Sequence, residues 1–230
     1  MKRRNFIIPV LAAIIVILCI TCCNSCKNDN GNVVSEGVIE YSATVVDQAN
    51  PMAALAPSKM TIKFKNNKSC AEMSAGMGLF STSFISNPET KTLTQLVKLL
   101  NKKFSLVQNE KKKKKENDQY KFELTPCNDT KMIAGYKCEK AHIKMQDDYN
   151  TEFDIWYTKD LAIQNPNFAN PFHMIDGVLM EYQMKKFGLE MRFVAKSVKN
   201  EDVDDAIFEL PADFKAISAQ EMTDLFESLQ

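Results

Sequence analysis

The chain has 230 residues, its 29 lysines and arginines equal its 29 aspartates and glutamates, and its hydrophobic fraction is 45%. This balance argues against nucleic-acid binding, which needs a strongly basic surface. The hydrophobic fraction is enough for a buried core, and the length suits a single domain.

The first stretch of the chain resembles an export signal. Lys2, Arg3 and Arg4 form a basic head, and residues 6–20 form an apolar run that only Pro9 interrupts. A basic head before a short apolar run is typical of a secretory signal. The run is also shorter than the roughly 20 residues of a membrane-spanning helix.

A cysteine cluster ends the apolar run, which suggests lipidation. In bacterial lipoproteins the signal is cut before a cysteine that is then acylated. Cys23 is the favoured acceptor, with Cys22 and Cys26 as alternatives, because none has a clean lipobox before it. Acyl chains such as palmitate would bind membrane lipid firmly. The other interpretation is an ordinary signal, or an uncleaved anchor, with incidental cysteines.

Lipidation at Cys23 would divide the chain into three parts. Residues 1–22 would be the signal peptide, 23–36 a flexible tether rich in Asn, Asp and Gly, and 37–230 a single β-rich domain. The mature chain would have 208 residues (230 minus 22). We expect it in the cell envelope, lipid-anchored at the outer membrane.

Three cysteines lie beyond the cluster, and an exported protein meets an oxidising compartment. A disulfide between Cys127 and Cys138 is favoured, because both flank one short connection. The alternative is three buried thiols, with Cys70 as the third.

Strand patterns dominate the rest of the chain. Apolar and polar residues alternate from Gly37, and again at Met60, Ile62 and Phe64. Residues 92–107 fit one face of a helix or two strands joined at Asn101-Lys102, and their place between strand pairs favours the hairpin. Lys111 to Lys115 is expected to be a solvated turn.

One helix is predicted, at the C-terminus. Ser218 and Glu221 form a capping box, and Met222, Leu225, Phe226 and Leu229 share one face behind it. A last short strand is expected at residues 206–210. Crossover helices between the strands are missing, so the predicted fold is mainly β: a curled antiparallel sheet with a C-terminal helix.

The sequence predicts no active site. His142 and His173 lie far apart, and neither has a metal-ligand spacing with another residue. No nucleophile elbow or phosphate loop is present, so we expect no cofactor, no metal and no enzyme. Met adapts to irregular apolar ligands. The candidate lining of a hydrophobic-ligand site is Trp156, Met180, Met191 and Phe193, although a sheet core would use the same residues.

One segment resembles a known group of exported proteins. Lys131 to Lys140 reads K-M-I-A-G-Y-K-C-E-K, with a Gly-Tyr-x-Cys motif, and the strand Trp156-Tyr157-Thr158 follows it. This pattern resembles an uncharacterised exported lipoprotein family of Gram-negative bacteria, related to the GLPGLI-type group. Residues 174–179 resemble that group's glycine-centred strand, with Met174 and Asp176 in place of its glycine and proline.

The resemblance implies a half-barrel like that of the lipoprotein-sorting carriers (LolA and LolB type), with a helical lid and an apolar concavity. The leading hypothesis is therefore a non-enzymatic, lipid-anchored protein that binds a hydrophobic ligand or acyl chain. The alternative is a structural or protein-interaction lipoprotein with a filled core. A cavity above roughly 300 Å³ would favour the first and a packed interior the second.

Overall fold

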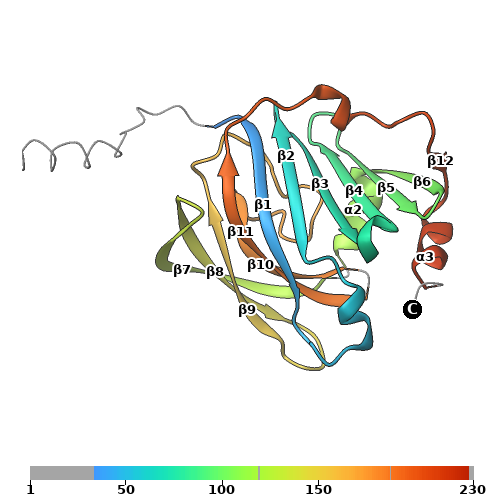
Figure 1. Cartoon of the computed structure of the whole chain (residues 1–230). Helices are drawn as coiled ribbons and strands as arrows, with labels where there is room; N and C mark the ends of the chain where they lie inside the picture. Colours follow the sequence, from blue (N-terminus) through green and yellow to red (C-terminus); the bar gives the residue numbers. More distant parts are fainter. Residues whose placement is uncertain (1–33, 119, 187, 228–230) are drawn as a thin grey trace, which may run out of the picture. The chain divides into compact units, whose positions relative to one another are not determined.

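Alternating sequence patterns produce one open, mixed sheet. The computed structural model describes residues 34–227 except 119 and 187, and twelve strands lie in that part of the chain (Figure 1). In chain order they are β1 (Glu36–Val45), β2 (Lys59–Lys65), β3 (Lys68–Ala75), β4 (Phe80–Asn87), β5 (Thr92–Leu99), β6 (Lys102–Asn109), β7 (Phe122–Ile133), β8 (Tyr136–Met145), β9 (Glu152–Thr158), β10 (Val178–Lys186), β11 (Leu189–Lys199) and β12 (Lys215–Ala216).

Short helices connect or follow the strands. The α-helices are α2 (Glu110–Asn117) and α3 (Ala219–Glu227). The 3-10 helices are η1 (Pro51–Leu55), η2 (Gly76–Gly78) and η3 (Asp205–Phe208).

Two antiparallel meanders make up the sheet. Its strand order is β12-β6-β5-β4-β3-β2-β1-β11-β10-β9-β8-β7. The meanders β1–β6 and β7–β11 therefore join where β1 pairs with β11. The chain passes from β6 to β7 through α2, from one end of the sheet to the other. The pair β12–β6 is parallel, which makes the sheet mixed rather than purely antiparallel.

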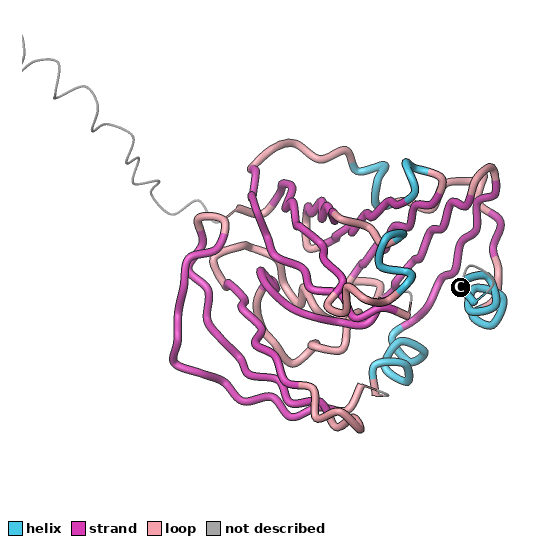
Figure 2. The backbone as a smooth tube through the Cα atoms, turned by 60° about the horizontal axis from the view of Figure 1, so that its bottom comes forward, coloured by secondary structure: helices cyan, strands magenta, loops and turns pink. Residues whose placement is uncertain are grey.

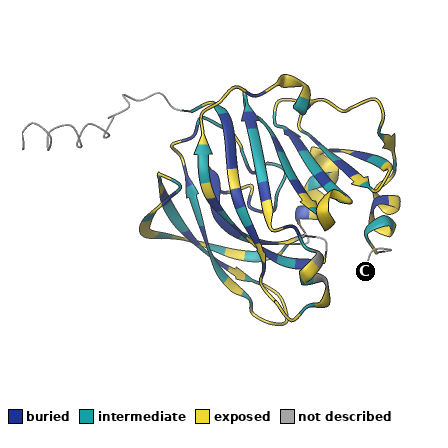
Figure 3. Cartoon of the chain, viewed as in Figure 1, coloured by how far each residue is buried: buried dark blue, intermediate teal, exposed yellow. Residues whose placement is uncertain are grey.

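The main core lies on one face of β1–β3 and β8–β11. Figure 3 shows buried positions along these strands in dark blue. Ile39, Tyr41 and Phe64 pack there with Met191 and Phe193. The loop between β9 and β10 contributes Phe172, whose ring contacts those of Phe122 and Phe153. Burial of such large side chains contributes about 1.5–3 kcal/mol each to folding.

The chain after β11 wraps around the β6 edge of the sheet. Phe208 of η3 packs with Leu96, whereas Met222 of α3 packs with Val97. Neighbouring residues of a strand point to opposite faces, so η3 and α3 cover opposite faces of β5. β12 lies between them along β6, and Figure 2 shows α3 beyond that edge.

Several predictions from the sequence are confirmed. The fold is mainly β, and residues 92–107 form the β5–β6 hairpin. The capping box closes on both sides: the Ser218 N–H donates to Glu221 Oε2 at 2.7 Å, and the Glu221 N–H donates to Ser218 Oγ at 3.2 Å.

Two local predictions are wrong. The lysines 111–115 lie in α2 rather than in a turn, because the Asn109 side chain caps the helix by accepting from the Lys112 N–H at 3.1 Å. Residues 206–210 do not form a strand. The Asp204 side chain accepts from the Ala206 N–H at 2.9 Å and starts η3.

The signal peptide and the lipidation candidates Cys22, Cys23 and Cys26 lie outside the described residues. Val34 is the first described residue, and it bridges to Leu161. Within residues 34–227, no helix combines the length and the apolar character needed to cross a membrane.

Candidate functional site

The face of β2–β5 that points away from the main core is polar. One row across the strands consists of Thr61, Glu72 and Ser83, which lie directly opposite one another in turn. In the next row Ser74 lies opposite Ser81, and Ser81 lies opposite Lys98. Alternation along each strand places these side chains on one surface, while their neighbours point to the other face.

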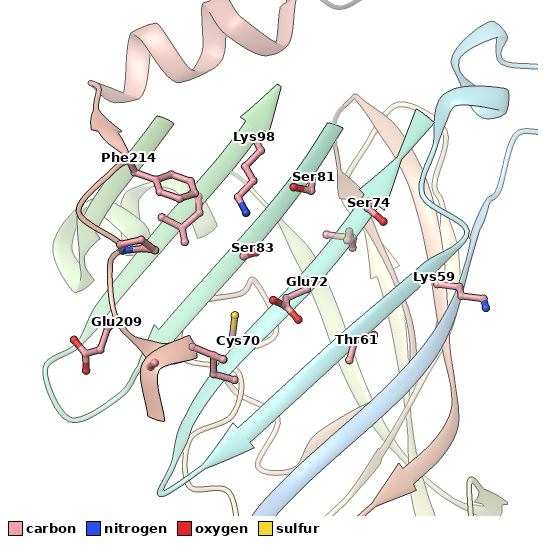
Figure 4. Close-up of a pocket in the computed structure, with 15 residues that line it drawn as sticks. Lys59, Thr61, Cys70, Glu72, Ser74, Ser81, Ser83, Lys98, Glu209 and Phe214 are labelled. Carbon is pink, nitrogen blue, oxygen red and sulfur yellow. The ribbon is translucent and has the colours of Figure 1, made fainter. Parts of the chain in front are cut away.

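The segment after β11 forms a wall over this surface. Val203 and Phe208 pack on an apolar patch at one end of it, made by Val38, Cys70, Ile85 and Leu96. Beyond that patch the segment continues past Glu209 to Phe214, alongside the polar rows. A groove of about 480 Å³ remains between wall and floor (Figure 4).

Ion pairs and hydrogen bonds hold the wall in place. The Val203 N–H donates to Glu36 Oε1 at 2.7 Å, and Lys65 Nζ donates to the Val203 carbonyl at 3.0 Å. Lys65 also pairs with Asp205 at 3.5 Å. The hydrogen bond from the Val203 amide holds the pKa of Glu36 below its ordinary value, although partial burial opposes this.

The far end of the wall is fixed to β5 and β6. Lys103 pairs with Asp213, and the ammonium groups of Lys98 and Lys103 each lie 5.8 Å from the centre of the Phe214 ring. Cation–π contacts of this kind orient an aromatic ring. The ring therefore stands as a fixed apolar surface beside a polar floor.

The groove offers hydroxyls, amines, carboxylates and one aromatic ring. Its lining is Lys59, Thr61, Cys70, Glu72, Met73, Ser74, Ser81, Ser83, Leu96, Lys98, Ala206, Ile207, Glu209, Pro211 and Phe214. Glu72 pairs with Lys63 at 2.7 Å. Burial raises the pKa of the Cys70 thiol to about 12, so this cysteine stays protonated at neutral pH and is a poor nucleophile.

The structure places three of the four predicted hydrophobic-ligand residues in the main core and the fourth at a half-buried position. Met180, Met191 and Phe193 are fully buried in the main core. Trp156 is half-buried, with Lys131 Nζ 4.1 Å from its ring centre. The hollow beside Tyr41, Leu179 and Tyr182 measures only about 70 Å³, far below the roughly 300 Å³ of a ligand pocket.

The predicted disulfide does not form in the structure. Cys127 and Cys138 are both free thiols, and a β-bulge in β7 separates their positions in the ladder, where Cys127 lies opposite Lys140 and Cys138 opposite Lys131. Burial raises the pKa of Cys138 to about 11.

The two histidines lie in different settings. His142 Nδ1 lies 2.9 Å from Asp154 Oδ1, and its Nε2 lies 3.5 Å from Glu152. His173 is exposed beside α2. Among residues 34–227, excluding 119 and 187, no three His, Cys, Asp or Glu side chains group at metal-binding distances.

Sequence patterns indicated half-exposed strands at the groove floor but not the groove itself. The hydroxyl of Thr61 occupies a polar position of the alternation at residues 60–65, whereas the pattern at residues 70–78, which include Ser74, fits either a short edge strand or a loop. The wall was missed because residues 206–210 were expected to form a strand. Phe214 follows Pro211 in a stretch with no periodic pattern, so no sequence signal marked it.

Fold and groove together define a β-sheet domain with a polar, hydroxyl-rich site beside an aromatic ring. A family model described as "N-glycanase peptide, N-terminal domain" matches residues 39–171, more than half of the chain. The chain therefore belongs to this family of N-glycanase N-terminal domains.

A solved structure has a similar fold. The structure of PNGF-II aligns over 84% of this chain with a TM-score of 0.50 and 16% sequence identity. This chain spans 32% of the length of that protein. The search of curated proteins finds no match.

The family match corrects the resemblance drawn from the sequence. The chain belongs to the N-glycanase N-terminal family and not to the GLPGLI-related lipoprotein family. The Gly-Tyr-x-Cys motif lies where β7 turns into β8: Ala134 and Gly135 have positive φ angles of 49° and 87° and form the turn. A tight hairpin explains the motif without shared ancestry.

The family match also corrects the function that was expected from the sequence. A non-enzymatic carrier of a hydrophobic ligand does not agree with a glycanase-related family, nor with a packed core around Met180 and Met191. The expectation of no enzyme is corrected by the family match, because the family is described as an N-glycanase domain. That expectation rested on the absence of local sequence motifs, which cannot reveal a site assembled from segments far apart in sequence.

Proposed function

We propose that this chain is an N-glycanase-type domain that acts on N-glycosylated peptides, with the groove as its glycan-binding site. One observation carries the proposal. The groove floor, from Lys59 to Lys98, lies within the matched residues 39–171 and has a surface chemistry suited to sugars.

Sugar rings combine hydroxyl groups with apolar C–H faces. Thr61, Ser81 and Ser83 can each donate and accept hydrogen bonds, and Lys98 donates. Phe214 offers the flat apolar surface on which a sugar face can pack. The volume of about 480 Å³ lies within the range of small-ligand sites.

The groove also holds two carboxylates, Glu72 on the floor and Glu209 on the wall. Hydrolysis of the amide bond that joins Asn to an N-glycan needs one group to take a proton from the attacking water and one to protonate the departing glycosylamine, and carboxyl groups can serve as such a base and acid. We assign Glu72 and Glu209 as the candidates for glycan release. This chain spans 32% of the length of PNGF-II. That the chain can release the glycan by itself is therefore part of the proposal.

The test uses the full chain and one peptide sequence with and without its N-glycan. Calorimetry should show binding of the glycosylated form alone. Phe214→Ala should weaken it roughly tenfold, and Phe214→Tyr should retain it. Tyr149→Ala is the matched control, because Tyr149 is an exposed aromatic that does not line the groove. Equal binding of both peptides would refute the glycan site.

Hydrolysis is measured separately by mass spectrometry of the same glycopeptide. We expect glycan release by the chain, and a loss of about 100-fold or more with Glu72→Gln. Glu40→Gln serves as control, because Glu40 lies on the same sheet but pairs with Lys199 outside the groove. Release that is unchanged in Glu72→Gln would remove Glu72 from the assignment and leave glycan binding intact.

Three features remain predictions from the sequence: the export signal, the location in the cell envelope with membrane lipid as partner, and the likeness to a half-barrel.

A further inference from the structure

A second hollow lies apart from the groove, between α2, the β4–β5 turn and the loop from Asn165 to His173. Its volume is about 370 Å³. Its lining is Pro88, Lys91, Glu110, Lys114, Asn117, Asn165, Phe168 and His173. None of these residues lines the groove.

Cationic and donor groups converge on this hollow from three segments. Lys91 comes from the β4–β5 turn, Lys114 from α2, and His173 from the loop before β10. The one carboxylate of the lining, Glu110, is already paired with Lys91 at 3.1 Å. Within the described part of the chain, the Lys114 ammonium has no carboxylate partner, so the hollow carries an uncompensated positive charge.

The rest of α2 strengthens this charge. The helix contains five lysines and two glutamates, and Glu116 pairs with Lys113 at 2.9 Å. Lys111 and Lys115 are one helical turn apart, a spacing at which like charges repel. These lysines lie outside the lining of the hollow, but they add to the positive potential around it, which would stabilise a bound anion.

The hollow is held by buried contacts. Asn117 is buried, and its Nδ2 donates to the Asn170 carbonyl at 3.0 Å, which ties α2 to the loop. Phe168 and Pro88 add apolar surface to the lining. A hollow that combines cationic and apolar groups suits a compact ligand with an anionic group and a ring. It suits a partner with a flat charged surface less well.

We propose that this hollow binds an anionic monosaccharide unit, a sugar ring that carries a phosphate, sulfate or carboxylate. The inference rests on the proposed function, since it makes the hollow a second subsite for acidic N-glycans. Lys114 faces the anionic group, and Phe168 packs on the ring.

The probes are mannose 6-phosphate, glucuronic acid, mannose and inorganic phosphate, titrated into the full chain by calorimetry at low salt. Both acidic sugars should bind more tightly than mannose. Lys114→Gln should weaken their binding roughly tenfold, the size expected when one charge-assisted hydrogen bond is lost. Lys112→Gln is the control, because Lys112 is an exposed lysine of the same helix outside the hollow.

Three results would overturn the inference: equal binding of mannose and the acidic sugars, binding unchanged in Lys114→Gln, or inorganic phosphate binding as tightly as the sugar phosphate. Vesicles of anionic lipid that displace mannose 6-phosphate through Lys114 would also overturn it, by assigning the site to a membrane surface. Failure of the groove is distinguishable, because neutral glycopeptide binding depends on Phe214 and not on Lys114.

Discussion

The Glu36 carboxylate accepts a hydrogen bond of 2.7 Å from the amide of Val203, which lies 167 residues further along the chain. Glu36 is the first residue of β1, and Val203 begins the wall of the groove. The contact therefore links the start of the domain to the segment that shapes the proposed glycan site.

Replacing Glu36 with Gln should loosen the wall. The neutral amide accepts a weaker hydrogen bond and loses the ion pair with Lys65 at 3.2 Å. Hydrogen exchange at the Val203 amide should become several-fold faster, while core amides keep their protection. Glu40→Gln is the control, because Glu40 bonds Lys199 and Ser197 instead. Equal acceleration in both variants would argue against a local effect.

The same contact should depend on pH. The pKa of Glu36 is lowered in the folded chain relative to its ordinary value of 4.5. The stabilisation that the Glu36 carboxylate contributes is therefore complete above pH 4.5, and it is lost as the pH falls through the lower pKa of the folded state. Exchange at Val203, corrected for intrinsic rates, should rise on acidification in the native chain but stay flat in Glu36→Gln. A flat profile in both would contradict this assignment.

Gly37 should not tolerate a side chain. A Cβ at this position would lie 2.2 Å from the Lys199 carbonyl oxygen, so β1 and β11 would have to separate. We expect Gly37→Ala to lower the free energy of unfolding by about 1–3 kcal/mol, as overpacking does. Gly78→Ala is the control: its φ of +89° is costly for alanine, but no atom lies within 4 Å. Chemical denaturation should show the larger loss for Gly37→Ala.

Glu181 should contribute to stability through its two cationic partners. It is only 8% exposed, pairs with Lys131 at 2.5 Å and also with Arg192. Burial raises its pKa, but the hydrogen bonds from the two cations outweigh burial and leave the pKa lowered. Glu181→Gln should cost about 1–3 kcal/mol in unfolding free energy at neutral pH.

That loss should shrink on acidification, because the contribution of Glu181 disappears as the pH falls through its lowered pKa. Glu139→Gln provides the comparison, since Glu139 pairs with Lys159 at an exposed site, where ion pairs are worth little. Similar losses in urea titrations of the two variants would contradict the role given to burial.

The sequence predicted the strands better than the connections between them. Alternation at Met60, Ile62 and Phe64 specifies β2 because one face of the strand is buried. No sequence pattern indicates the parallel pairing of β12 with β6, because β12 has only two residues and both are exposed. The helix at the lysines 111–115 was hidden because its capping residue, Asn109, also fits a turn.

The groove was beyond sequence reasoning for a physical reason. Its floor consists of outward-facing hydroxyls such as Ser83, which resemble any solvated strand face. Its wall depends on long-range contacts, such as Glu36 with Val203 and Lys103 with Asp213, and on the packing of Phe208 against Leu96. Residues such as Met180 and Trp156 were easier to single out, but Met180 belongs to the core and Trp156 makes a cation–π contact with Lys131.

The central claim is that the groove binds the glycan of an N-glycosylated peptide. The most direct measurement is amide NMR of the isotope-labelled full chain titrated with that glycopeptide and with its unglycosylated form. We predict that the glycopeptide alone shifts resonances at Thr61, Ser83 and Phe214, and that in Phe214→Ala the shifts at Thr61 and Ser83 need roughly tenfold more glycopeptide. Unchanged groove resonances, or identical shifts with the bare peptide, would contradict the account.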